Sequence, residues 1–214
     1  MFVVESVLTG SVRNFADGET SAIAKTPVKG LRTIGWLGID GDTQADLWVH
    51  GGPDKAIHHY PRDHYAFWRN ALGSNPLLDR AGAFGENIST TGLTEDIACI
   101  GDRYRLGTTL VEIAQGRQPC WKQAYRLDDK NVITTMVASR RCGWYYRVIE
   151  EGAVAAGDAL TLLDRPCRDW TIARVIALLI AGEGKHDKAA VRALAGLNVL
   201  ADNWRQRAAK LAAR

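Results

Sequence analysis

The chain has 214 residues, 46% hydrophobic and 24% charged, a composition typical of a globular protein rather than a disordered, collagen-like or coiled-coil one. Its net charge of +3 is too small to indicate nucleic-acid binding, and its longest apolar run, Val175 to Ala181, is far shorter than the roughly 20 residues of a transmembrane helix. The N-terminus lacks the basic and apolar stretches of a secretory signal, so we expect a cytoplasmic protein.

Short β-strands dominate the pattern of the first 164 residues. Most candidates carry β-branched, aromatic or leucine residues, and glycine punctuates the chain between them. In chain order, the expected strands cover residues 3–8, 21–25, 31–37, 104–106, 110–113, 144–148 and 159–163.

Two helices are expected among these strands. The first begins near Pro61, because proline suits the first turn of a helix, and continues to Gly73 with apolar residues at helical spacing. The second runs from Asp128 or Asp129 to about Arg140. Many short strands with few helices predict a mainly β fold, a barrel or sandwich with helical decoration.

The composition changes after Pro166. Residues 165–214 hold 10 Lys and Arg against 4 Asp and Glu, whereas residues 1–164 hold 17 against 20. Three helices are expected in this tail: one capped by Thr171, one capped by Asp187 and one over residues 201–213. Fewer than 50 residues bury little core alone, so we expect the tail to dock on the β domain and to contribute no catalytic residues of its own.

Cys120 is the first candidate for chemistry. The four cysteines form no C-x-x-C pair, which argues against a zinc finger or a thioredoxin-type site. Cys120 follows an apolar strand and a proline, so we expect it on a loop, and Arg117 and Lys122 flank it. Nearby cations favour the thiolate, which is a nucleophile and a soft metal ligand. The alternative is a small buried thiol between solvated charges.

A second candidate is the glycine-rich segment from His50 to Lys55. Paired Gly51 and Gly52 allow close approach of the backbone to an anion, and Lys55 adds positive charge. An ordinary turn is the alternative. A zinc or iron site from His50, His58 or His59 is disfavoured, because these histidines match no standard ligand spacing.

A third candidate is the segment from Gly82 to Ser89. Asn87 could bind an amide or carbonyl of a ligand, or it could cap its own turn. Lys25, in a separate loop near the N-terminus, adds one more cation.

Together these segments resemble the MOSC family, named for the C-terminal domain of molybdenum cofactor sulfurase, and within it the YiiM-like group. The helical tail resembles the small domain that follows MOSC in this group, so the resemblance covers nearly the whole chain. The matching stretches are residues 25–28, 41–46, 49–55, 60–68, 82–95, 101–102 and 117–122.

The resemblance implies a β-barrel-like MOSC domain over residues 1–164 and a three-helix domain over residues 165–214. It implies a pocket for the molybdenum cofactor, a pyranopterin phosphate that holds molybdenum, with Cys120 ligating the metal or carrying sulfur. A cationic pocket suits an anionic pterin phosphate. The residues expected to bind the cofactor are His50, Gly51, Gly52, Lys55, Asn87, Arg117 and Lys122.

The resemblance also implies the reduction of N-hydroxylated bases such as 6-hydroxylaminopurine. This two-electron step needs a cofactor, and the sequence has no flavin, haem or iron–sulfur signature, so we expect electrons from a donor protein. The alternative is a non-catalytic carrier of the cofactor or of cysteine-bound sulfur. Nucleic-acid binding is disfavoured, because the tail has only Trp170 and Trp204 as aromatic residues and no recognition motif.

Overall fold

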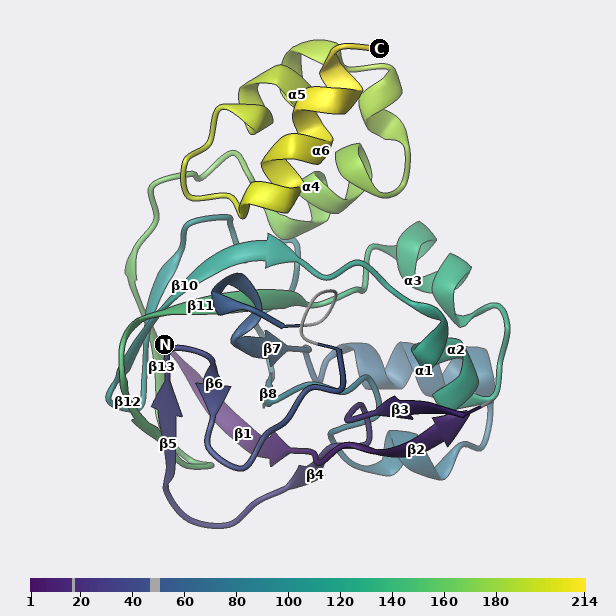
Figure 1. Ribbon diagram of the computed structural model, residues 1–214, viewed down its shortest axis with the longest axis vertical. Helices are drawn as coiled ribbons and strands as arrows, with labels where there is room; N and C mark the ends of the chain where they lie inside the picture. Colours follow the sequence, from purple (N-terminus) through teal and green to yellow (C-terminus); the bar gives the residue numbers. More distant parts are fainter. Residues whose placement is uncertain (17, 47–50) are drawn as a thin grey trace.

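The computed structural model describes residues 1–16, 18–46 and 51–214. Figure 1 shows a strand-rich body with a group of helices from the C-terminal part of the chain set above it. The predicted mainly β fold with a helical C-terminal part is confirmed.

A closed barrel of seven strands forms the body. In spatial order the strands run β13-β9-β10-β11-β7-β8-β1, and β1 closes the barrel by pairing with β13. All these pairs are antiparallel except β7 with β8, which makes the barrel mixed. The strands are β1 (Phe2–Thr9), β7 (Ile57–His59), β8 (Ile88–Thr90), β9 (Arg103–Leu106), β10 (Thr109–Gly116), β11 (Trp144–Glu150) and β13 (Ala159–Asp164).

Alternation along β11 shows which face of the barrel sheet is turned to the core. Trp144, Tyr146 and Val148 are buried in the core, whereas the residues between them face the other side of the sheet. Closure pairs both edges of the sheet and leaves no open barrel edge for other chains.

Smaller strands lie outside the barrel. β2 (Arg13–Ala16) and β3 (Glu19–Ser21) form a hairpin, β4 (Thr26–Pro27) pairs with β1, and β5 (Arg32–Gly35), β6 (Gly38–Ile39) and β12 (Gly152–Val154) form a separate sheet. The predicted strand at residues 21–25 was wrong, because β3 ends at Ser21 and the next residues run as irregular chain. β7, β8 and β12 were not predicted, since each has only three residues.

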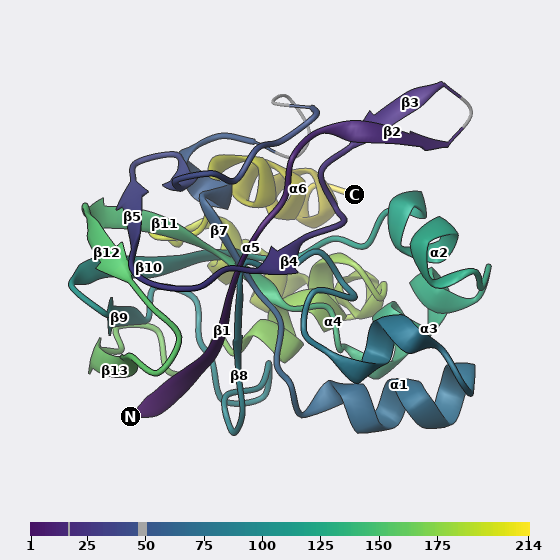
Figure 2. The same cartoon turned by 90° about the horizontal axis from the view of Figure 1, so that it is seen from below.

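Three helices of the first part lie together on one side of the barrel, near the β2–β3 hairpin (Figure 2). They are α1 (His64–Leu72), α2 (Trp121–Leu127) and α3 (Val132–Ser139), and short 3-10 turns occur at Pro53–Lys55 and Pro76–Asp79. α1 was predicted from Pro61. The predicted second helix is α3, which begins later than expected because Asn131 takes the cap position. α2 was missed, since its seven residues are too few for a periodic pattern.

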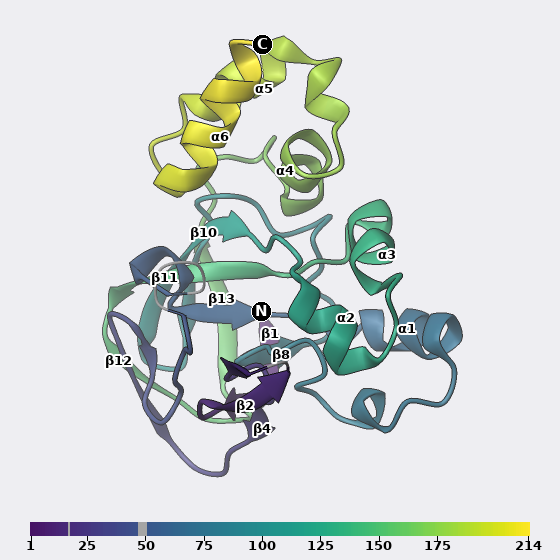
Figure 3. The same ribbon diagram turned by 45° about the vertical axis from the view of Figure 1, so that its right-hand side comes forward.

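The three predicted C-terminal helices are present. They are α4 (Ile172–Leu179), α5 (Lys188–Ala195) and α6 (Asp202–Ala212), with a 3-10 turn at Glu183–Lys185. Thr171 and Asp187 cap α4 and α5 as predicted, by accepting hydrogen bonds from the backbone N–H groups of Arg174 and Ala190. Figure 3 shows α4 and α6 above β10, and the buried face of α4 joins the barrel core.

Among the described helices, none combines the length and apolar composition that a membrane crossing needs. The cytoplasmic location stays a prediction.

His59 lies inside the barrel with both ring nitrogens bonded. Nδ1 pairs with the Tyr146 hydroxyl and Nε2 with the Thr90 hydroxyl, each at 3.0 Å, and the ring lies against Trp144. Burial lowers the pKa of His59 from 6.5 to about 3. The histidine is therefore a neutral core residue at physiological pH.

We expect the free energy of unfolding to fall as the pH is lowered from 7 to 5. The unfolded chain takes up a proton at residue 59 that the folded chain excludes, so acid favours the unfolded state, by about 2 kcal/mol at pH 5 from this residue. Urea unfolding at both pH values should show a smaller pH difference for His59→Gln. The exposed His186→Gln is the matched control and should keep the wild-type difference. Equal pH differences in His59→Gln and wild type would contradict the expectation.

Candidate functional site

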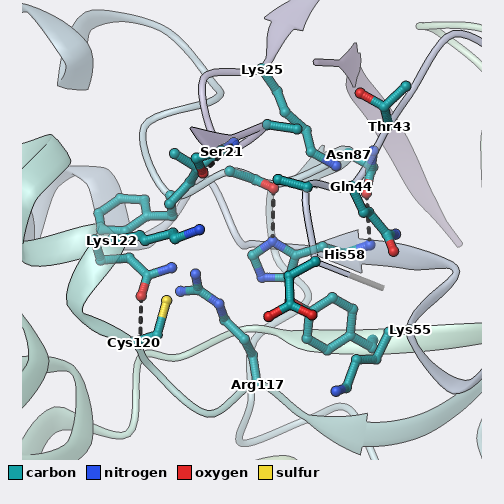
Figure 4. Close-up of a pocket in the computed structure, with 18 residues that line it drawn as sticks. Ser21, Lys25, Thr43, Gln44, Lys55, His58, Asn87, Arg117, Cys120 and Lys122 are labelled. Atoms are coloured by element: carbon teal, nitrogen blue, oxygen red, sulfur yellow. Dashed lines mark hydrogen bonds between the residues drawn. The ribbon is translucent and has the colours of Figure 1, made fainter. Parts of the chain in front are cut away.

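An open cleft lies where the end of β10 meets β7, β11 and the loops around the β2–β3 hairpin (Figure 4). It encloses about 580 Å³ of empty space, part of it open to solvent. Its labelled lining residues are Ser21, Lys25, Thr43, Gln44, Lys55, His58, Asn87, Arg117, Cys120 and Lys122. The structure thus brings together five predicted site residues from separate parts of the sequence: Lys55, Asn87, Arg117, Cys120 and Lys122.

Cys120 lies on the loop between β10 and α2, as predicted, and as the last residue of that loop it also takes the N-cap position of α2. Pro119 precedes it, and Gln123 fixes the turn by accepting a hydrogen bond from the backbone N–H of Cys120 at 2.8 Å. The thiol is partly exposed in the cleft, so the alternative of a fully buried thiol is wrong. In Figure 4 the side chain of Arg117 extends toward the thiol, and that of Lys122 extends into the cleft.

The two cations that flank Cys120 in the sequence are both buried in the cleft wall. Lys122 donates from Nζ to the carbonyl oxygen of Thr20 at 2.9 Å and lies 3.7 Å from the Glu19 carboxylate, which holds the β2–β3 hairpin against α2. Arg117 is only 5% exposed, and its Nη1 atom has no hydrogen-bond partner in the described part of the chain. A buried donor without a partner costs free energy, so Arg117 favours an acceptor in the cleft.

Asn87 joins three segments of the cleft. Its side-chain amide donates to the carbonyl of Leu8 at 3.1 Å and to the Asp42 carboxylate at 2.9 Å, and its side-chain oxygen accepts from the backbone N–H of His58 at 3.0 Å. Asp42 also accepts from Nζ of Lys25 at 2.6 Å. The polar atoms of Asn87 are therefore engaged by the protein itself.

The loop from Gly82 to Asn87 is held by a buried carboxylate. Glu86 accepts from the backbone N–H groups of Gly82 and Phe84, at 2.7 and 3.1 Å, and from the Tyr65 hydroxyl at 2.5 Å. Gly85 adopts a left-handed conformation with φ of 77°, and a β-carbon there would lie 2.7 Å from Ile23. Glycine and glutamate in this motif fix the loop, and the loop places Asn87.

His58 is a buried neutral base at the cleft. Its Nδ1 lies 3.1 Å from the Gly85 carbonyl, which can only accept, so we assign the proton to Nδ1 and leave Nε2 as an acceptor. Nε2 is buried and has no partner among the described residues. Burial and the nearby charge of Arg117 lower the pKa of His58 well below its usual value. Adjacent strand residues face opposite sides, so His58 and His59 do not ligate one metal ion together.

The glycine-rich segment is only partly in the cleft. Lys55 lines it, and burial lowers the pKa of this lysine. Gly51 and Gly52 do not line it; Gly52, with φ of 97°, begins the 3-10 turn that carries Lys55. His50 lies outside the described residues. The role of the segment in binding stays a prediction.

Sequence reasoning gave no role to several cleft residues, among them Tyr145, Gln123 and His58. Tyr145 was overlooked because only its buried neighbours on β11 were noted, yet strand alternation turns the residue between them outward. Gln123 was missed because helix α2, which places it beside Cys120, was not predicted. His58 was noted but given no role, and only its contact with Gly85 decides which nitrogen is free.

The chain is similar to known proteins in both sequence and fold. The MOSC domain model matches residues 46–161, just over half of the chain. The chain is 41% identical over 172 residues to Protein YiiM of Escherichia coli, covering 80% of this chain and 76% of that protein. The crystal structure of YiiM from Geobacillus stearothermophilus superposes with a TM-score of 0.84 at 31% identity, covering 99% and 100% of the two chains.

One relative has a name that states an activity. A protein of Gibberella moniliformis named "Reductase" is 36% identical over 176 residues, which cover 81% of this chain. The chain spans only 31% of that longer protein.

We expect iodoacetamide at neutral pH to modify Cys120 before the other thiols. Burial raises the pKa of Cys99 to about 11 and also raises the pKa values of Cys142 and Cys167, and the thiolate is the reacting form. Peptide mapping should show Cys120 modified at least about tenfold faster. Cys120→Ser should remove the fast phase. Faster labelling of Cys167, the other partly exposed thiol, would contradict this ranking.

Proposed function

The chain belongs to the MOSC domain family, and we propose that it binds molybdenum cofactor in the cleft around Cys120 and reduces N-hydroxylated bases there. The observation that carries the proposal is a partly exposed thiol in a cleft walled by Arg117, Lys122, Lys55 and Lys25. A thiolate suits a soft metal, and buried cations suit an anionic pterin phosphate.

Buried polar atoms without hydrogen-bond partners indicate which ligand groups the cleft can bind. Nη1 of Arg117 and Nε2 of Gln123 are donors without an acceptor, and Nε2 of His58 is an acceptor without a donor, among the described residues. Their residues all line the cleft. Leaving such atoms unpaired costs about 1–3 kcal/mol each, so a ligand with anionic oxygens and some N–H groups is favoured. The chain's residues therefore fit the cofactor.

Each residue has a distinct part in this proposal. Cys120 binds the metal through its thiolate, and Arg117 and Lys122 bind the anionic groups through charge-assisted hydrogen bonds worth about 1.5–3 kcal/mol each. Asn87 holds the frame through Asp42, since its amide is already engaged. The β2–β3 hairpin, held by Lys122, forms one side of the cleft through Ser21.

The reaction needs two electrons and two protons. The N–O bond of an R–NHOH substrate breaks, and R–NH₂ and water form. When bound, the molybdenum centre supplies the electrons. In the cell an electron-transfer protein would supply these electrons to the centre. In the assay a reduced viologen dye supplies them. The fungal relative named "Reductase" supports this class of reaction.

The test measures bound molybdenum and turnover together. Protein made in a host that synthesises the cofactor should contain molybdenum and should convert 6-hydroxylaminopurine to adenine with reduced viologen. Protein from a cofactor-deficient host should do neither. Bound molybdenum without turnover would overturn the reductase and favour the carrier. Equal turnover in both preparations would overturn the cofactor assignment.

Cys120→Ser should lower turnover at least about 100-fold while the protein stays folded. Even residues that only orient metal ligands contribute 10–100-fold to metal affinity or activity, and a hydroxyl is a poor ligand for a soft metal. Turnover and circular dichroism check this. Cys167→Ser, at an equally half-buried thiol, is the matched control and should keep wild-type turnover. Near wild-type reduction by Cys120→Ser would rule out the thiolate–metal assignment.

Arg117→Ala and Lys55→Ala should reduce cofactor retention more than stability. Loss of one charge-assisted bond weakens binding by about 1.5–3 kcal/mol, roughly 10- to 150-fold. Molybdenum content after dialysis and melting temperature should be measured on the same samples. The exposed Arg105→Ala, outside the cleft, is the control. Wild-type metal content in both cleft variants would sink the assignment of the cations to the cofactor.

A further inference from the structure

The C-terminal helices contact the strand end that carries Arg117 and Cys120, and they do so at a glycine. A β-carbon on Gly116 would lie 3.1 Å from Cη2 of Trp204 on α6 and 3.2 Å from Cγ1 of Ile176 on α4. Ordinary carbon contacts are about 3.5–4.0 Å. The bare backbone of Gly116 therefore packs directly against both helices, in the region where Figure 3 shows them above β10.

Glycine matters at this position for the space it leaves and not for its backbone conformation. The φ of Gly116 lies outside the left-handed region that favours glycine. A methyl group added there would act through steric pressure between the strand and the helices. A substitution at Gly116 is therefore a clean probe of this contact.

Two hydrogen bonds extend the contact on both sides of Gly116. The backbone N–H of Ala201 donates to the carbonyl of Ala114 at 2.9 Å, and Nη1 of Arg207 donates to the side-chain oxygen of Gln118 at 2.8 Å. Trp204, between them on the chain, is 4% exposed. Residues 201–207 thus hold the chain before, at and after Gly116.

We propose that Trp204 is a positioning residue: by packing on Gly116 it fixes where Arg117 and Cys120 lie in the cleft. The inference rests on the proposed function only for its turnover assay. It gives the C-terminal helices a part in the site although they contribute no residue that lines the cleft. The expected absence of catalytic residues in the tail is compatible with this role.

The size of the effect follows from how sensitive reacting groups are to position. A misplacement of 1 Å can cost about 100-fold in rate. A methyl group on Gly116 has to displace its neighbours by a few tenths of an ångström. We expect Gly116→Ala to lower kcat/KM about tenfold, mainly through kcat, with the melting temperature within a few degrees of wild type.

A second readout needs no cofactor. In a Cys167→Ser background, cofactor-free Gly116→Ala should react with iodoacetamide at Cys120 at a rate that differs at least about threefold from wild type, because a displaced strand end moves the thiol within the cleft and changes the approach of the reagent. A changed rate without any turnover, even in wild type, would support the positioning and overturn the proposed function. Wild-type alkylation in a folded Gly116→Ala protein would overturn the positioning alone.

Rescue separates positioning from general damage. Phenylalanine lacks the outer ring atoms of tryptophan that approach residue 116, so Gly116→Ala/Trp204→Phe should return both readouts to within about twofold of Trp204→Phe alone. A folded double variant that is no better than Gly116→Ala would overturn the proposal. Gly196→Ala is the matched control, since its β-carbon would meet only ordinary contacts of 3.4 Å or more, and it should match wild type.

An exposed variant keeps the test decisive should Gly116→Ala fail to fold. Arg207→Ala removes the hydrogen bond to Gln118 at the surface without touching the core. It should change the alkylation rate of Cys120 at least about twofold. An unchanged rate in both Arg207→Ala and a folded Trp204→Phe, which removes the ring atoms that meet residue 116, would then overturn the proposal.

Discussion

The antiparallel pairing of β10 with β11 is the interaction on which the site depends. It sets Gln115 opposite Tyr145 and Gly116 opposite Trp144, and β11 in turn sets Tyr145 opposite His58 on β7. Because paired residues face the same side of a sheet, Tyr145 and His58 face the cleft together. The backbone N–H of Arg117 still bonds the carbonyl of Gly143 at 2.9 Å, so the chain leaves the sheet at the cleft edge.

Buried polar groups then fix the loops around that sheet. Glu86 holds the turn from Gly82 by three hydrogen bonds, and Asn87, directly after it, binds β1, β7 and Asp42 at once. A network in which the members are satisfied is rigid, because breaking any one bond leaves a buried group unpaired. By contrast, Nη1 of Arg117 and Nε2 of Gln123 are buried without hydrogen-bond partners among the described residues, and both residues line the cleft.

The sequence predicted the parts of the fold that have long patterns or strong caps. The strands β1, β10 and β11, helix α1 and the caps at Thr171 and Asp187 follow from alternation, helical spacing and capping chemistry. The short β7, β8 and α2 were missed, because a three-residue strand and a seven-residue helix each hold less than two periods of their own pattern. Their structure comes from partners distant in the chain, as in the single parallel pair of His59 with Ile88.

For the site, the sequence by itself determined the chemistry: which side chains are thiol, cation or amide, and the order of the motifs that carry them. Only the tertiary structure decided what each one does. Asn87 is bonded to the protein through all its polar groups, His58 presents a free nitrogen, and Gly116 lies bare against Trp204. These outcomes depend on contacts between residues 27 to 88 positions apart, and a local sequence pattern carries no information about which distant backbone will occupy the adjoining space.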